Sequence, residues 1–168
     1  QGHIEELLVS PLSEVSIVIG YLAGGIIRGL SVAVVVTFIA LFFTQINIKY
    51  PIMTLFVIIM TAGVFSLAGL INAIFAKKFD DIAVIPSFVL APLTYLGGVF
   101  YTVNLLPEFW QTVSKFNPIL YMINSMRYSV IGISDVSIQN ALMMIIIFFI
   151  ILFFSAVILL KKGIGTRQ

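Results

Sequence analysis

Four long runs without a charged residue constrain this chain more than any other feature of its sequence. The runs cover residues 29–48, 50–76, 82–107 and 136–160. Each reaches the roughly 20 residues with which a helix crosses a bilayer, and backbone groups in lipid bond within their own helix. With 61% hydrophobic and 10% charged residues, the chain cannot cover its apolar surface as a soluble domain does, because such a domain is about 25% charged. The sequence therefore predicts an all-α membrane protein, a helical bundle with spans at about residues 22–45, 51–76, 82–101 and 137–160.

Residues that could carry catalysis or bind a metal are scarce. The chain has no cysteine and a single histidine, His3, so neither a disulfide nor a Cys or His metal site is expected. The patterns G-x-x-x-x-G-K-[ST], H-E-x-x-H and G-x-S-x-G do not occur. The basic residues form no stripe, so the net charge of +2 does not indicate a nucleic-acid partner. We expect no enzyme activity and no cofactor in this chain.

The basic residues also predict how the chain is oriented in the membrane. Five of them fall on one side of the predicted spans: Lys77, Lys78, Lys161, Lys162 and Arg167. Three fall on the other side: Lys49, Lys115 and Arg127. Because basic residues concentrate on the cytoplasmic side, both ends of the chain are expected in the cytoplasm. Arg28 is expected about one turn inside the first span, where its side chain can reach the headgroups.

Small residues recur at helical spacing in the first two spans. The first span carries two overlapping glycine pairs, Gly20 with Gly24 and Gly25 with Gly29. The second carries a stripe at steps of three and four residues: Ala62, Ser66, Gly69, Ala73 and Ala76. Such spacing lets two helix backbones approach closely. It is typical of ordinary packing between membrane helices, and it also suits helices that slide within a moving bundle.

The third predicted span is interrupted by residues that break helices. Pro86 and Pro92 lie within it, and Gly97 and Gly98 lie near its end. A proline inside a helix removes a hydrogen bond and kinks the helix. The interruption fits a broken helix that lines a transport route and, equally, a static kink of the kind that membrane helices tolerate.

The stretch 102–135 is too polar for two full crossings and long for a bare loop. Apolar residues recur at helical spacing after Pro107, which suits the first turn of a helix. Asn117 and Pro118 end this helix, and a second short helix is expected at about residues 119–130. We interpret the stretch as a re-entrant hairpin of two short helices that dip into the outer leaflet. A helix that lies flat in the interface is the alternative.

The segment 3–16, which leads into the first span, combines acidic and apolar residues. Three glutamates are interspersed with three leucines, and Pro11 interrupts the pattern. Acidic residues are not attracted to the anionic lipid of the cytoplasmic leaflet. We therefore expect a short amphipathic helix on the cytoplasmic side that binds a protein partner, with a solvated linker as the alternative.

Two parts of the chain resemble the ABC-2 type transporter permeases, the membrane domains of a class of ABC exporters. The sequence EELLVSPLS, from Glu5 to Ser13, resembles the segment that couples these permeases to their ATPase. The sequence from Pro92 to Tyr128 resembles the family's signature near its last spans. The elements P-x-x-x-L-G-G-x-F, L-P and N-P-x-x-Y, followed by an arginine, appear in the family's order. The resemblance covers nearly the whole chain, and its elements are specific as a set.

The resemblance implies a fold and a function. Members have six membrane helices, act as dimers, and are coupled to a cytoplasmic ATPase subunit that binds ATP and magnesium. They export drugs, lipid-linked glycans or other amphiphiles. This chain begins with Gln1 rather than Met, and we expect residues 1–168 to be the C-terminal, four-span part of such a membrane domain in the bacterial cytoplasmic membrane.

The resemblance also implies roles for particular residues. Those implied to contact the ATPase are Glu5, Glu6, Leu7, Leu8, Ser10, Pro11, Leu12 and Ser13. Those implied to form an outer gate are Pro92, Gly97, Gly98, Phe100, Pro107, Trp110, Asn117, Pro118, Tyr121 and Arg127.

A second function is compatible with the same features. A membrane scaffold or assembly subunit that transports nothing would use the same packing faces and aromatic residues to bind its partners. A carrier driven by protons or ions is less favoured, because such carriers place ionisable groups within their spans. Co-purification separates the first two functions, since only a permease is expected to retain an ATPase subunit through residues 5–13.

Overall fold

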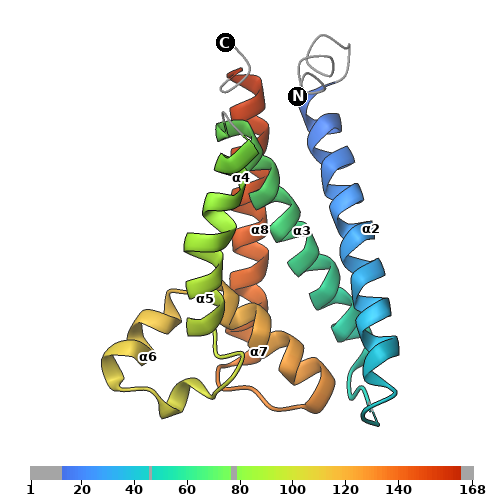
Figure 1. Ribbon diagram of the computed structural model, residues 1–168, viewed down its shortest axis with the longest axis vertical. Coiled ribbons are helices and arrows are strands. Elements are labelled where there is room, and N and C mark those ends of the chain that lie inside the picture. The colour runs from blue at the N-terminus through green and yellow to red at the C-terminus, as the bar shows by residue number, and fades with distance from the viewer. Residues whose placement is uncertain (1–12, 46, 77–78, 164–168) are drawn as a thin grey trace.

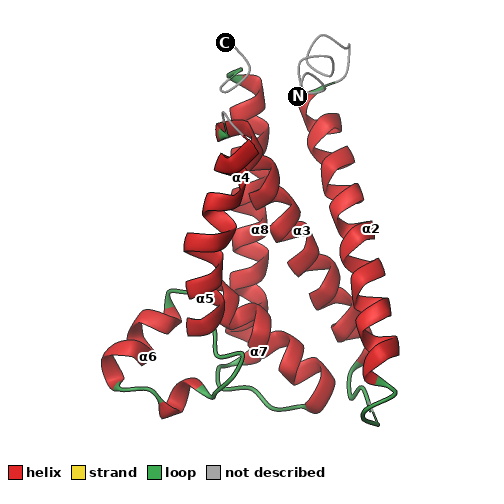
Figure 2. Cartoon of the chain, in the orientation of Figure 1, coloured by secondary structure: helices red, strands yellow, loops and turns green. Residues whose placement is uncertain are grey.

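The computed structural model of the protein describes residues 13–45, 47–76 and 79–163. Its elements, in chain order, are α2 (Glu14–Ala40), α3 (Pro51–Phe75), α4 (Phe79–Ile85), the π-helix η1 (Pro86–Leu90), α5 (Ala91–Leu96), the 3₁₀-helix η2 (Val103–Leu105), α6 (Glu108–Lys115), α7 (Pro118–Ile131) and α8 (Ile138–Lys161). Helices and the loops between them make up all of these residues (Figure 2). The predicted all-α class is confirmed for this part of the chain.

Within the described residues, three helices are long and apolar enough to cross a membrane. They are α2 with 27 residues, α3 with 25 and α8 with 24. At about 1.5 Å per residue each measures roughly 36–40 Å, which exceeds the roughly 30 Å of a hydrocarbon core. Helix α3 packs against both α2 and α8, so it forms the centre of the bundle (Figure 1).

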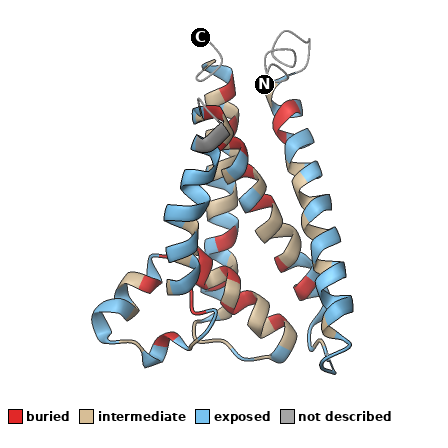
Figure 3. Ribbon diagram, in the orientation of Figure 1, coloured by how far each residue is buried: buried red, intermediate tan, exposed pale blue. Residues whose placement is uncertain are grey.

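The core lies where these three helices meet. Val18 of α2, Leu67 of α3 and Ala156 of α8 are almost completely buried there. The opposite faces of the helices are exposed (Figure 3) and are themselves apolar, as at Val34 and Phe154. Soluble proteins rarely expose apolar surface on this scale. The arrangement is that of a helical membrane bundle.

The third predicted span is a broken helix with few neighbours. The chain stays helical from α4 through η1 to α5, and the prolines are accommodated by the wider π turn of η1, in which the Ala91 N–H donates to the Pro86 carbonyl. The helix ends at Leu96, five residues before the predicted end at 101. It touches the bundle near its two ends: the Asn72 amide donates to the Ile82 carbonyl at 2.9 Å, and α5 contacts α7.

A layer of short helices closes one end of the bundle. We call η2, α6 and α7 the capping layer; it lies at the end opposite the start of α2 and the end of α8 (Figure 1). Helix α7 packs across the ends of α3 and α8. It begins at Asn117, whose side-chain oxygen accepts from the Ile119 N–H at 3.0 Å, and it stops at Gly132, whose φ of +82° is the left-handed conformation that glycine tolerates.

Candidate functional site

The predicted ATPase-coupling segment leads directly into the first long helix. Its residues up to position 12 lie outside the described part of the chain. Ser13 is the N-cap of α2: its hydroxyl accepts from the Ser16 N–H at 3.3 Å and bonds the Ser16 hydroxyl at 2.8 Å. The cap fixes the first turn of α2. A protein that binds the preceding segment would therefore be connected to a helix that runs the length of the bundle.

Four of the nine predicted small-residue positions form a close contact between α2 and α3. A Cβ added to Gly25 would overlap the side chain of Ser66, and one added to Gly29 would lie 2.6 Å from the Ala62 Cβ. The Ser66 hydroxyl donates to the Tyr21 carbonyl of α2 at 3.0 Å. We call Gly25, Gly29, Ala62 and Ser66 the small-residue seam; it requires glycine on the α2 side.

The other small residues do not pack in this way. Gly20 and Gly24, on the neighbouring face of α2, and Gly69 of α3 would meet nothing within 4 Å if a Cβ were added. Together with Ala73 they line an open groove, which the four seam residues also border. The two glycine pairs therefore have different surroundings despite their identical spacing.

The groove extends along one face of the bundle. It has a volume of about 1340 Å³ and is lined by residues of α2, α3, α5 and α7. Its lining begins at Ser16 in the first turn of α2 and extends to Met126 in the capping layer. Most of the lining side chains are apolar, and Arg28 is the one charged residue among those described. The groove therefore connects the two ends of the bundle through an apolar environment.

Four of the predicted gate residues are brought together where α5 meets the capping layer. A Cβ on Gly97 would lie 2.8 Å from the Ile123 side chain of α7, so the end of α5 is pressed against that helix. The Asn117 amide donates to the Leu93 carbonyl of α5 at 2.6 Å. Gly98 and Arg127 meet in the same region, because the guanidinium donates to the Gly98 carbonyl at 2.6 Å.

The remaining predicted gate residues are arranged differently. Pro118 and Tyr121 belong to α7, and the Tyr121 hydroxyl donates to the Lys115 carbonyl, which ties α6 to α7. Four others are exposed and reach no common point: Pro92, Phe100, Pro107 and Trp110. The structure therefore does not unite all ten residues in one constriction.

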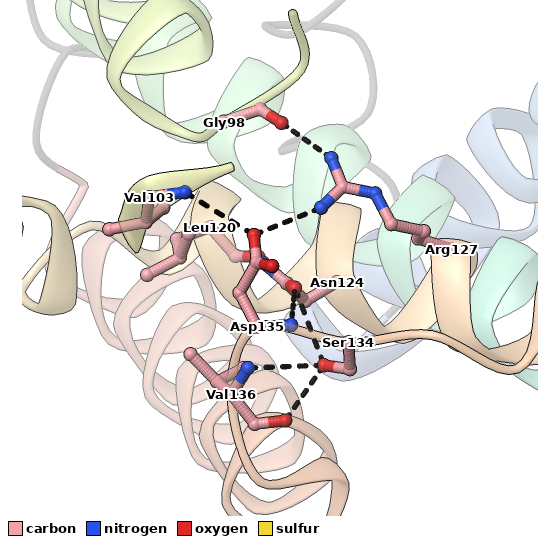
Figure 4. A network of polar contacts seen from close by, with 8 residues as sticks. All are labelled: Gly98, Val103, Leu120, Asn124, Arg127, Ser134, Asp135 and Val136. Atoms are coloured by element: carbon pink, nitrogen blue, oxygen red, sulfur yellow. Dashed lines mark hydrogen bonds and ion pairs between the residues drawn. The ribbon is translucent and has the colours of Figure 1, made fainter. Parts of the chain in front are cut away.

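A partly buried ion pair joins α7 to the loop before α8 (Figure 4). Arg127 and Asp135 are 3.0 Å apart, with side chains 20% and 7% exposed. The same carboxylate oxygen accepts from the Val103 N–H at 3.3 Å. The pair therefore joins four segments: the end of α5 through Gly98, the start of η2, helix α7 and the loop before α8.

Asn124 holds the acidic partner of this ion pair in place. Its side-chain oxygen accepts from the Asp135 N–H at 2.8 Å and from the Ser134 hydroxyl at 3.3 Å. Its amide donates to the Leu120 carbonyl one turn earlier in α7. Asn124 is completely buried, so these bonds satisfy a polar side chain that would otherwise be costly to bury. Neither Asn124 nor Asp135 was predicted from the sequence as a site residue. The available signal was that Asp135 is the one acidic residue after Glu108.

The loop between α2 and α3 is fastened to the other end of α7. The backbone N–H groups of Lys49 and Tyr50 donate to the carbonyls of Val130 and Ser129, at 3.0 and 2.9 Å. The rings of Tyr50 and Tyr128 stack with their centroids 5.4 Å apart. A side-chain hydrogen bond with Tyr50 raises the pKa of Tyr128 above its usual value. This contact was not predicted, because a contact between a loop and a distant helix leaves no periodic pattern in the sequence.

The comparisons with known proteins agree with one another. The family model described as ABC-2 type transporter matches residues 1–131. The inner membrane transport permease YadH of Escherichia coli K12 is 53% identical over 136 residues, which are 81% of this chain and 53% of that protein, and the Shigella flexneri protein of that name gives the same figures. Nodulation protein J of Rhizobium leguminosarum bv. trifolii is 28% identical over 76 residues, 45% of this chain and 29% of that protein. The chain spans about half the length of the permeases named YadH. No solved structure matches the chain.

Proposed function

The chain belongs to the ABC-2 type transporter family, and from this membership we propose that it is the C-terminal, membrane-spanning part of a permease subunit. The full-length subunit moves an amphiphilic substrate, such as a drug, a lipid or a glycan-like molecule, outward across the bacterial cytoplasmic membrane. A separate cytoplasmic ATPase subunit binds ATP and magnesium and supplies the energy. The permease acts as a homodimer, with both ends of this chain on the cytoplasmic side.

The observation that carries the proposal is the groove beside the small-residue seam. It runs from Ser16 to the capping layer, and its walls are almost entirely apolar. Apolar walls suit the hydrocarbon part of an amphiphile, and a groove that extends along the spans suits a molecule that moves between the two leaflets. Beyond the lining residues, the Arg127–Asp135 pair joins α7 to the loop before α8, and Arg127 also binds Gly98 after α5.

Helix α2 is the natural element for transmitting ATPase motion. It follows the proposed coupling segment directly in the sequence and begins at the Ser13 cap. It also forms one wall of the groove and one side of the small-residue seam. A displacement of the coupling segment would therefore change the width of the groove, because the seam lets α2 move along α3 without large side chains in the way.

Co-purification of the full-length permease with its ATPase subunit tests the proposal. Glu6→Ala and Pro11→Ala in the coupling segment are expected to reduce the retained ATPase by at least about fivefold, or to leave ATP hydrolysis unstimulated by the permease. Glu108→Ala is the matched control, because it removes an exposed glutamate of α6 at the opposite end of the bundle. Full retention and stimulation in both coupling variants would contradict the assigned role. A wild-type permease that retains no ATPase would favour a membrane scaffold.

A further inference from the structure

The broken helix is tied to α3 by a bond that replaces one lost to a proline. We call α4, η1 and α5 together the strap (Figure 1). In a regular α-helix the Ile82 carbonyl would accept from the N–H of residue 86, but Pro86 has no N–H. The Asn72 amide of α3 donates to this carbonyl instead, at 2.9 Å. Asn72 is only 8% exposed, and a buried amide is costly unless it is hydrogen-bonded. The bond therefore fixes the first end of the strap to α3.

Two further donors tie the other end of the strap to the capping layer. The Leu93 carbonyl lies in the last turn of α5, where carbonyls have no donor within the helix. The Asn117 amide donates to it at 2.6 Å. The Arg127 guanidinium donates to the Gly98 carbonyl just beyond α5, also at 2.6 Å. The strap is therefore attached to α3 at one end and to α7 at the other.

The middle of the strap has a weaker backbone ladder than a regular helix. In η1 the Ala91 N–H donates to the Pro86 carbonyl five residues earlier, which is the wider π form that often marks functional sites. Pro92 follows directly and has no N–H to donate. Bending a regular helix in lipid would break hydrogen bonds that lipid cannot replace. Since the two prolines already lack their N–H groups, the strap can change its bend at η1 at a lower cost than a continuous helix could.

We infer that the strap is a hinged connection between α3 and the capping layer, with η1 as the hinge and Asn72 as a positioning residue. The inference rests on the proposed function, in which ATP hydrolysis moves the helices of the permease. When the capping layer moves relative to α3, the strap is attached to both and bends at η1. The alternative is a static kink, in which Asn72 only satisfies the Ile82 carbonyl.

Double electron–electron resonance measures the bending in the full-length permease with its ATPase subunit in nanodiscs. Spin labels replace Phe88 of η1 and Phe154 of α8, two exposed side chains. The strap extends about 8 Å from Phe88 to each attached carbonyl, so a change in bend of about 20–40° would move η1 by about 1–3 Å. The mean distance is expected to shift by this amount between the nucleotide-free complex and the complex trapped with ATP.

Three variants separate the hinge from a static kink. Pro86→Ala restores the N–H that the Ile82 carbonyl lacks, so it favours a continuous helix and should abolish the shift without lowering thermal stability. Asn72→Leu removes the attachment to α3 and should lower thermal stability and abolish the shift. The double variant Asn72→Leu/Pro86→Ala should regain thermal stability, because the Ile82 carbonyl has a donor again, and should still show no shift. A static kink predicts the wild-type shift in Pro86→Ala and in the double variant.

Matched controls remove the same residue types outside the strap. Pro51 lies in the first turn of α3, and Asn140 is exposed near the start of α8, so Pro51→Ala and Asn140→Leu should keep the wild-type shift. Loss of the shift in either control would overturn the inference, as would the wild-type shift in Pro86→Ala or in the double variant.

The remaining outcomes also decide between the proposals. If Asn72→Leu does not fold, Pro86→Ala and the double variant still test the hinge. A complex that hydrolyses ATP and shows no shift at η1 in the wild type loses this inference alone. A permease that retains no ATPase loses the proposed function and this inference with it.

Discussion

Replacing Arg127 with glutamine should destabilise the permease substantially, because it leaves a buried carboxylate without its counter-charge. Asp135 is only 7% exposed and keeps one backbone donor, the Val103 N–H, after the cation is gone. The loss of one partner from a buried ion pair typically costs about 3–5 kcal/mol. The Gly98 carbonyl also loses its 2.6 Å hydrogen bond. The free energy of unfolding is therefore expected to decrease by about 3–5 kcal/mol in Arg127→Gln.

The opposite replacement should be milder. Asp135→Asn keeps a side-chain oxygen that can accept from Val103, and Arg127 is 20% exposed and retains the Gly98 carbonyl. The expected loss is that of one charge-assisted hydrogen bond, about 1.5–3 kcal/mol. In the double variant Arg127→Gln/Asp135→Asn neither charge is left unpaired. The double variant should therefore lose less free energy of unfolding than the two single variants together, by at least about 1 kcal/mol, as is usual for residues in direct contact.

Equilibrium unfolding of the full-length permease in mixed micelles measures these losses. Tryptophan fluorescence is a suitable signal because Trp110 lies on α6 in the capping layer. Lys115→Gln is the control and should change the free energy of unfolding by less than about 0.5 kcal/mol, as exposed substitutions do. A loss below about 1 kcal/mol for Arg127→Gln, or single losses that simply add, would refute the reasoning that a buried pair fastens the layer.

Three further predictions concern backbone approach and polar burial. Gly25→Leu should destabilise the bundle by about 1–3 kcal/mol through overpacking, because the leucine side chain would enter the space of Ser66. Gly24→Ala is the control and should not destabilise the bundle, because an added Cβ there meets nothing within 4 Å. Thermal unfolding followed by circular dichroism compares the two variants. Gly132→Ala should cost about 1–2 kcal/mol because φ is +82° at that position, as measured by the same unfolding assay; no loss would mean that α7 ends in another conformation. Asn124→Ala should lower the free energy of unfolding by about 1–3 kcal/mol. It should also speed hydrogen exchange at the Asp135 N–H, which donates to Asn124. An unchanged exchange rate would contradict this prediction.

The helices and the family could be predicted from the sequence for a physical reason. Lipid leaves a charge-free run of 20 or more residues no stable form other than helix, and α2, α3 and α8 follow from that constraint. The motifs between Pro92 and Tyr128 gave the family resemblance, which the family match over residues 1–131 confirms. Asn117 and Pro118 mark the boundary between α6 and α7 because the pair suits the cap and first turn of a new helix.

The side-chain arrangement could not be predicted, because it depends on how the helices rotate against one another. The pairs Gly20/Gly24 and Gly25/Gly29 have the same spacing, but they lie about 140° apart around a helix of 3.6 residues per turn. Only the position of α3 decides that the second pair meets Ser66 and Ala62 closely, whereas the first pair has nothing within 4 Å of an added Cβ. The Arg127–Asp135 pair likewise depends on the path of a loop, since Asp135 lies beyond the end of α7.

The most direct test of the account is whether ATP moves α2 relative to the capping layer. Spin labels at Val36 of α2 and at Phe116 beside α6, both on exposed side chains, report this distance by double electron–electron resonance in the full-length permease with its ATPase subunit. The account predicts that the distance distribution shifts between the nucleotide-free complex and the complex trapped with ATP. Identical distributions in a complex that hydrolyses ATP would contradict it.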